Sequence, residues 1–119
     1  MKFKKYDINS ANVPEHLKTF DYGVDYDSLI ESEKSLFQIN SYRWTVQEVQ
    51  NILDEISILE GEERYEYQVE GGNLGISIYT DEVYFFDLTN KKEEEDFIWS
   101  TESFILFLNE FKAFLEDNQ

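Results

Sequence analysis

The 119-residue sequence contains no cysteine and only one histidine. Without cysteine there is no disulfide, no thiolate zinc site and no thiol nucleophile. The single histidine, His16, follows Pro14 and Glu15 in a segment without periodicity, so it offers no strong candidate for a Ser-His-Asp or Cys-His triad. We therefore predict that the protein is not an enzyme and that it holds no cofactor and no metal.

Proline, glycine and long apolar runs are also scarce. One proline and five glycines are spread along the chain, and no repeat or low-complexity tract divides it, which predicts a single domain over residues 1–119. No apolar run reaches the length of a membrane span, and none follows the N-terminal lysines as the apolar part of a signal peptide would. The sequence thus predicts a cytoplasmic protein without a membrane partner.

Two short patterns resemble ligand-binding motifs, and both have simpler interpretations. The run Gly71-Gly72-Asn73-Leu74-Gly75 connects two predicted strands, whereas a phosphate-binding loop opens a helix, so we interpret it as a hairpin turn. The acids Asp21, Asp25 and Asp27 have neither the glycine at the sixth position nor the glutamate at the twelfth that an EF-hand loop requires.

Basic residues are few beside acidic ones. Ten Lys and Arg face 26 Asp and Glu, which gives a net charge of −16, larger than the magnitude of about 2 to 8 expected of a small soluble domain. This charge repels nucleic acid phosphates and anionic membranes, and it attracts basic proteins. We therefore expect a basic protein as partner and no nucleic acid. The alternative is that the charge only keeps the protein soluble.

Aromatic residues are abundant, and two helices follow from the spacing of apolar ones. Ten Phe, eight Tyr and two Trp predict a core built largely from rings. Thr45 and Glu48 form a predicted capping box ahead of apolar residues at helical spacing, so we place a helix at about 45–59, which ends near Gly61. A second amphipathic helix, at about 101–115, starts at an N-cap candidate, Ser100, and has a face made of Phe104, Phe107, Leu108, Phe111, Phe114 and Leu115.

Between the helices the apolar period changes from 3.6 to 2. Alternation predicts strands at 65–69 and 74–79, and further apolar runs predict strands at 83–88 and 96–99. The short connections favour antiparallel order, so the fold class is α+β: an antiparallel meander of about four strands with one helix before it and one after it. Residues 1–8 predict a short strand anchored by Phe3 and Tyr6. Residues 9–25 look irregular, and residues 26–39 fit either a helix or a loop with a strand.

Mixed acidic and aromatic segments supply the candidate partner-binding residues. Interfaces often place an aromatic anchor among polar groups, and both kinds of residue interleave at 60–70 and again at 81–96. Tyr65 and Tyr67 either anchor a partner or point into the core beneath solvated glutamates. The candidates are Glu62, Glu63, Tyr65, Glu66, Glu70, Asp81, Glu82, Glu93, Glu94, Glu95 and Asp96.

The C-terminal half, with its aromatic strand and amphipathic helix from Asp96 to Leu108, resembles the small acidic immunity proteins of bacterial toxin systems, including contact-dependent growth inhibition. The resemblance implies tight binding to a cognate toxin domain, expected here to be a nuclease whose active site is basic. Two alternatives remain: a nucleic-acid mimic that inhibits a DNA-binding or defence enzyme, and a general protein-interaction domain.

Overall fold

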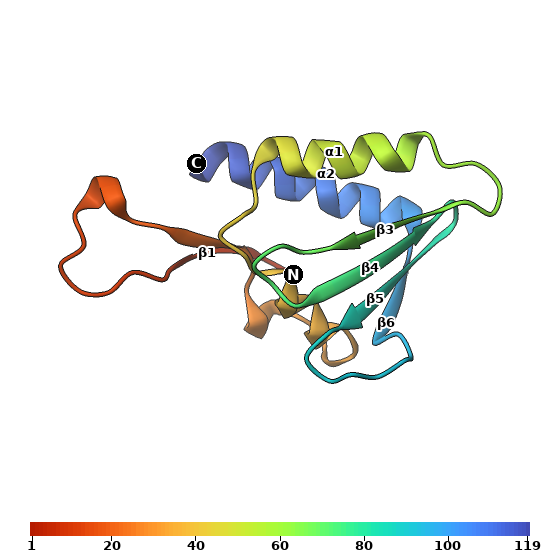
Figure 1. Ribbon diagram of the computed structural model, residues 1–119, viewed down its shortest axis with the longest axis horizontal. Helices are drawn as coiled ribbons and strands as arrows, with labels where there is room; N and C mark the ends of the chain where they lie inside the picture. Colours follow the sequence, from red (N-terminus) through yellow and green to blue (C-terminus); the bar gives the residue numbers. More distant parts are fainter.

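Four antiparallel strands form the main sheet of the computed structural model, which describes residues 1–119 (Figure 1). They are β3 (Arg64–Gln68), β4 (Leu74–Tyr79), β5 (Glu82–Asp87) and β6 (Phe97–Ser100), and they lie side by side in sequence order. Every neighbouring pair is antiparallel. The predicted α+β class with a four-stranded meander is therefore confirmed.

The glycine-rich run forms the turn between β3 and β4. Gly71 has a φ of +76°, a left-handed conformation that costs glycine little. The amide of Val69 donates to the carbonyl of Leu74 at 3.0 Å and closes the hairpin. The interpretation of these residues as a hairpin turn is confirmed.

The first helix, α1, runs from Val46 to Ser57. At its start, one of the two hydrogen bonds of the predicted capping box is formed. The hydroxyl of Thr45 accepts from the amide of Glu48 at 3.1 Å. The carboxylate of Glu48 does not return to the start of the helix as predicted; it accepts from the hydroxyl of Tyr67 at 2.8 Å. The helix stops at Ser57, before the predicted stop at Gly61, which lies in the following turn.

The second helix, α2 (Thr101–Asn118), is three residues longer at its C-terminal end than the predicted 101–115. Ser100 caps it as predicted, since its hydroxyl accepts from the amide of Ser103 at 3.1 Å. Of the six residues predicted for its apolar face, Phe114 is half-buried and the other five are buried: Phe104, Phe107, Leu108, Phe111 and Leu115. The hydroxyl of Thr101 donates to the carbonyl of Tyr79 at 2.8 Å and ties the start of the helix to β4.

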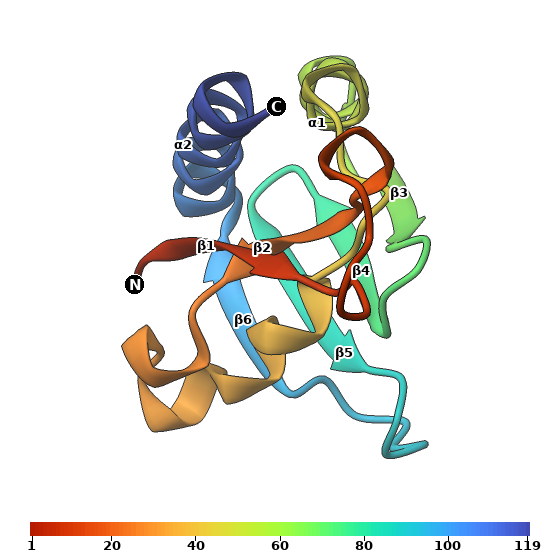
Figure 2. The same cartoon turned by 90° about the vertical axis from the view of Figure 1, so that its left-hand side faces the viewer.

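All covering elements lie on one side of the main sheet, so the core is between them and the sheet's inner face (Figure 2). The inner face is formed by the buried residues of the alternating strands, such as Leu74, Ile76 and Ile78. They belong to one cluster of 21 buried hydrophobic residues to which both helices and both sheets contribute. Trp44 is part of it, and its indole donates to the carbonyl of Ile39 at 2.8 Å.

Residues 20–24 form a strand that the sequence did not predict. β1 (Phe3–Asp7) pairs in antiparallel fashion with β2 (Phe20–Val24), so the expectation of an irregular segment at 9–25 is wrong for its last part. The reason is a distant contact: the side chain of Asn40 accepts from the amide of Val24 at 2.7 Å and lies where a side chain on Gly23 would be. Gly23 therefore makes room for a partner rather than breaking the strand.

Of the two possibilities for residues 26–39, the structure has helix rather than a loop with a strand, in the form of two 3-10 helices, η2 (Tyr26–Ser28) and η3 (Glu31–Ile39). The strands β1 and β2, with the loop of residues 8–19 between them, form a hairpin that projects from the body and is seen at the left of Figure 1. We call residues 1–24 the N-terminal arm. It accounts for part of the molecule's long axis of 51 Å.

Candidate functional site

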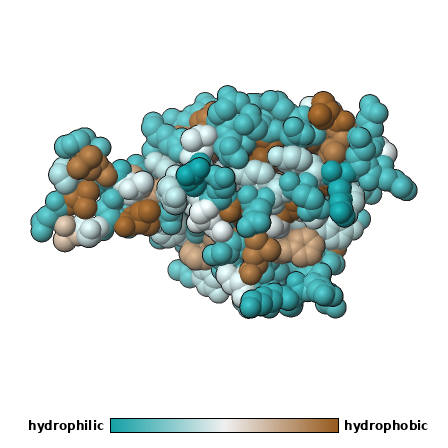
Figure 3. All heavy atoms as spheres, viewed as in Figure 1, coloured by the Kyte–Doolittle hydropathy of each residue, from teal (hydrophilic) through white to brown (hydrophobic).

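The outer face of the main sheet has no element packed over it and faces the viewer in Figures 1 and 3. Antiparallel register places side chains of adjacent strands in rows across this face: Glu66 lies beside Ser77, Ser77 beside Tyr84, and Tyr84 beside Ile98. In Figure 3, apolar side chains are scattered among hydrophilic ones over the sheet. This face differs from the inner one in being both aromatic and polar.

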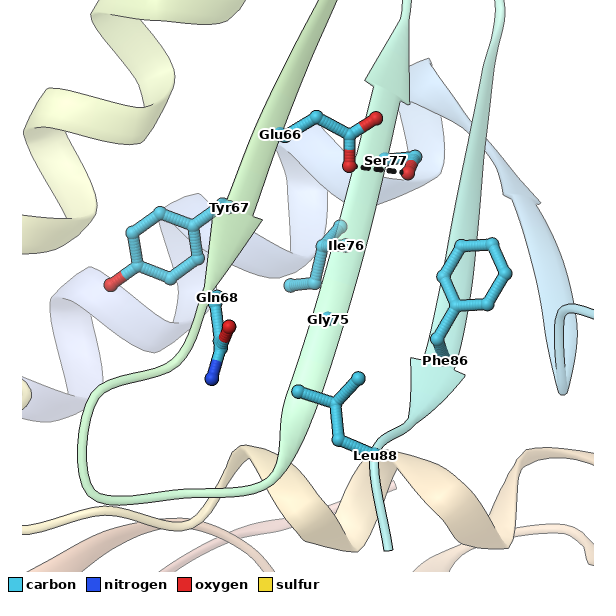
Figure 4. A pocket seen from close by; sticks show the side chains of 8 residues that line it. All are labelled: Glu66, Tyr67, Gln68, Gly75, Ile76, Ser77, Phe86 and Leu88. Carbon is cyan, nitrogen blue, oxygen red and sulfur yellow. Dashed lines mark hydrogen bonds between the residues drawn. The ribbon is translucent and has the colours of Figure 1, made fainter. Parts of the chain in front are cut away.

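Two adjoining hollows of about 420 and 430 Å³ lie on this face and share Ser77 and Phe86. Figure 4 shows the first of them, with Glu66, Ser77, Phe86 and Leu88 around it and Tyr67 turned away toward α1. Leu88 packs over Gly75, where the nearest atom of its side chain is 3.3 Å from the position a Cβ would take. The second hollow is lined in part by Tyr79, Asp81 and Tyr84.

An aromatic strip runs along β5 on the outer face, starting from the end of β4. It consists of Tyr79, Tyr84 and Phe86, with the exposed Leu88 and Ile98 beside it. The rings of Tyr79 and Tyr84 meet edge to face, with centroids 5.5 Å apart. A pair of rings in this geometry offers a large and rigid contact area.

Carboxylates border the aromatic strip and shape its electrostatics. Glu66 accepts from the hydroxyl of Ser77 at 2.7 Å and pairs with Arg64 at 3.2 Å. The carboxylate of Glu82 raises the pKa of the Tyr84 hydroxyl by repelling the phenolate, and Glu95 adds to this effect. Tyr84 therefore stays neutral and can donate a hydrogen bond in a negative surrounding.

The structure separates the predicted partner-binding residues into two groups at opposite ends of the strands. Glu62 and Glu63 lie in the loop before β3, and Asp81 and Glu82 lie at the turn between β4 and β5. These loops meet, because the hydroxyl of Thr80 donates to the carbonyl of Gly61 at 3.1 Å. The other group follows the far ends of the strands: Glu70, Glu93, Glu94 and Glu95. Two of the predicted residues lie in strands on the outer face itself, Glu66 in β3 and Glu82 at the start of β5.

Tyr65 is not an outward-facing anchor. Its side chain is partly buried on the inner side of β3, packed against the core, with its ring centroid 6.4 Å from that of Tyr67. Burial raises the pKa of Tyr65, and repulsion from Glu55 and Glu48 adds to the rise. Of the two interpretations of the tyrosines in β3, the structure supports the one in which they point toward the core.

Asp96 is a buried structural residue rather than a surface residue, because its side chain is only 8% exposed. Its carboxylate accepts from the amide of Asp87 at 2.6 Å and pairs with Lys92 at 3.1 Å. Burial raises the pKa of this carboxyl, but the hydrogen bonds from Asp87, Lys92 and Asn90 outweigh burial and hold the pKa below its ordinary value. Asp96 thus fastens the loop between β5 and β6.

We expect Asp96→Asn to lower the free energy of unfolding at neutral pH by about 1–3 kcal/mol, because buried polar partners lose a charged acceptor. A carboxyl whose pKa is lowered by folding stabilises the native state above its unfolded pKa of about 3.9, and this contribution disappears as pH falls through the folded pKa. Urea denaturation should therefore show a difference between variant and wild type that shrinks in acid. Glu94→Gln in the same loop is the control with no expected effect, and equal stability of Asp96→Asn and wild type at pH 7 would contradict the assignment.

The other sequence candidates lie apart from the outer face. His16 is exposed in the loop of the N-terminal arm, and Asp25 accepts from the amide of Asp27 at 3.3 Å to cap η2. No group of three or more His, Asp or Glu side chains is placed to hold a metal ion. Neither α1 nor α2 combines the length and apolar character needed to cross a membrane.

Sequence reasoning missed three residues of the outer face, Tyr84, Phe86 and Ile98. The alternation predicted at 74–79 implies that Ser77 and Tyr79 lie opposite the apolar residues, and pairing this strand with the next would have placed Tyr84 beside Ser77. Comparison with models of known protein families, with curated proteins and with solved structures finds no match for the chain.

Proposed function

We propose that the protein acts by binding a basic protein across the outer face of its main sheet and so blocking it. The observation that carries this proposal is the aromatic strip of Tyr79, Tyr84 and Phe86, half-buried on a face that no other element covers and bordered by carboxylates. Binding energy at protein interfaces concentrates in such central aromatic residues, and surrounding polar groups exclude water from them.

The charge of the partner follows from the charge of this protein. A net charge of −16 gives a long-range attraction for basic surfaces and raises the rate of encounter with them. The loops at both ends of the strands add carboxylates around the face, among them Glu63, Asp81 and Glu95. A partner with a basic patch next to an apolar one fits this arrangement.

The class of partner that we propose is a toxin with nuclease activity, and the protein is then its immunity protein in the cytoplasm. Nuclease active sites are basic because they hold phosphate, so an acidic surface can cover them. Inhibition of a DNA-binding enzyme by mimicry of phosphates needs the same charge. It makes less use of an aromatic centre, and this favours the immunity function over the mimic.

Co-expression with the product of the neighbouring gene tests the proposal. We expect the pair to form a complex, the partner to be basic, and cells that make the partner to survive only when this protein is present. Association should slow as salt rises, because exposed charges are screened beyond about 8 Å at physiological ionic strength. An acidic partner, or an association rate independent of salt, contradicts the proposal, and inhibition of a restriction or defence enzyme favours the mimic.

A further inference from the structure

One edge of the main sheet is open. The strand β3 pairs with β4 alone, and Figure 1 shows it at the border of the sheet beside α1. The opposite border, β6, is held against η3, where the indole of Trp99 donates to the carboxylate of Glu33 at 2.8 Å. An open strand edge presents a row of unpaired backbone groups with which a further strand can pair.

The register shows which backbone groups of β3 are open. The amide of Val69 donates to the carbonyl of Leu74 at 3.0 Å, and this pair continues the register of β3 and β4. Bonded and non-bonded pairs alternate along an antiparallel ladder, which places the backbone groups of Tyr67 toward β4 as well. The amides and carbonyls of Glu66 and Gln68 therefore point away from β4, to the side where no strand pairs with them.

The two sides of this edge differ in their side chains. Glu66 points to the outer face, and Tyr67 points to the opposite side, toward α1 (Figure 4). On that side Glu48 accepts from the hydroxyl of Tyr67, and the repulsion of Glu55 and Glu48 adds to the rise that burial causes in the pKa of Tyr65. Neither of these two carboxylates forms an ion pair. The side that faces α1 thus has two tyrosine rings beside two carboxylates that no basic side chain neutralises.

A hollow of about 310 Å³ lies at the C-terminal end of this edge. It is lined in part by Trp44 and Tyr67, with Glu48 and Glu70 among its polar residues. Its one basic residue, Arg43, pairs with Glu70 at 2.8 Å, which leaves the charge of Glu48 without a cation. Rings next to a carboxylate suit the apolar stem and the charged end of a lysine or arginine side chain.

The charge around the edge selects its occupant. Residues 43–70 include eight acidic residues and two basic ones, a net charge of −6. Both arginines are already paired, Arg43 with Glu70 and Arg64 with Glu66 at 3.2 Å. A second copy of this chain would bring the glutamates of two β3 strands together, and like charges on neighbouring strands are unfavourable.

We propose that an extended basic segment adds to the edge of β3 as a fifth strand of the main sheet, with lysine or arginine at the alternate positions that face α1. The inference rests on the proposed function for the source of the segment, which is the basic partner itself. The added strand would lie next to Glu66, which also lines the first hollow of the outer face, so one partner can contact both. Backbone bonds then supply affinity, and the alternating side chains supply specificity.

Amide hydrogen exchange of the isolated protein tests the added strand directly. The probe is a synthetic peptide of four Lys-Val repeats, and the control is the same peptide with Glu in place of each Lys. With saturating Lys-Val peptide, exchange at the amides of Glu66 and Gln68 should slow about tenfold or more, because they gain a hydrogen-bond acceptor. The amide of Tyr67, which faces β4, should change little. Unchanged exchange at Glu66 and Gln68, or equal protection by the Glu-Val peptide, overturns the proposal.

A proline at the open edge gives the second measurement. Glu66→Pro removes the outward amide hydrogen and leaves the bonds to β4 in place, since an edge strand accepts proline where its N–H faces solvent. Glu66→Ala is the matched control, because it loses the same carboxylate and keeps the amide. The dissociation constant of the Lys-Val peptide should be about tenfold higher for Glu66→Pro than for Glu66→Ala. Equal constants in the two folded variants overturn the proposal, and the exchange measurement on the wild-type chain decides if the proline variant does not fold.

The added strand and the proposed function can fail separately. If a complex with a basic partner forms and the amides of Glu66 and Gln68 exchange in it as in the free chain, strand addition is wrong and the proposed function stands. If the Lys-Val peptide protects these amides but the product of the neighbouring gene is acidic or does not bind, strand addition stands and the proposed function is wrong.

Discussion

Replacing Phe111 with alanine is expected to lower the free energy of unfolding by about 3–5 kcal/mol, the cost of deleting a buried ring. Phe111 is fully buried on α2. Its ring centroid lies 5.3 Å from that of Phe3 in β1 and 5.2 Å from that of Trp44, which precedes α1. The ring therefore connects the arm, the second helix and the start of the first, and its loss removes contacts in all three.

A loss of this size is a large part of the stability of about 5–15 kcal/mol that a natural domain has. Urea denaturation at neutral pH measures it, and Leu106→Ala is the matched control, because Leu106 lies on the same helix with its side chain 61% exposed. Equal denaturation midpoints for Phe111→Ala and wild type would mean that this face of α2 is not core.

The main sheet and both helices were predictable because local patterns determine them. In β4 the residues alternate strictly between buried and half-buried, which is the period of a strand with one covered face. The apolar residues of α2 recur at helical spacing, and Ser100 marks its start. Where propensity, period and capping agree in this way, a short segment specifies its own structure.

β2 and the 3-10 segments were not predictable in the same way, because distant residues determine them. Gly23 reads as a strand breaker, yet the strand forms because Asn40 bonds to the backbone of Val24. Two backbone hydrogen bonds between Tyr22 and Ser41, the residue after Asn40, also join β2 to the body. No periodicity within residues 9–25 carries this information, since the partners lie some 16 to 19 residues further on.

The candidate site was predictable in composition and not in geometry. Acidic residues in the loops, such as Glu62 and Asp81, were expected at a surface, and they lie there. The sequence does not tell which face of the sheet the helices cover, so it could not decide whether Tyr65 or Tyr84 points outward. It also could not tell that Asp96 accepts from the amide of Asp87, since hydrogen bonding depends on how the loop closes.

The second large effect that we expect is a loss of affinity for the basic partner when an aromatic side chain of the outer face is removed. We expect Tyr84→Ala to weaken binding by about 2 kcal/mol, or about 30-fold, because central aromatic residues dominate interface energies. The effect should be in the dissociation rate, since the ring is neutral and acts at short range. Tyr26→Ala is the control: Tyr26 is 46% exposed but lies in η2, outside the sheet.

Reversal of charge at the rim should act differently and completes the test. In a variant with Glu62→Lys, Glu63→Lys and Glu66→Lys, the association rate should fall more than the dissociation rate rises, because rim charges steer the encounter and remain solvated in the complex. The fall should diminish as salt is added, whereas the effect of Tyr84→Ala should persist. Stopped-flow or surface-bound kinetics at two salt concentrations separate the two rates. If a folded Tyr84→Ala variant dissociates from the partner at the wild-type rate, the outer face is not part of the interface, even if the rim variant still slows association.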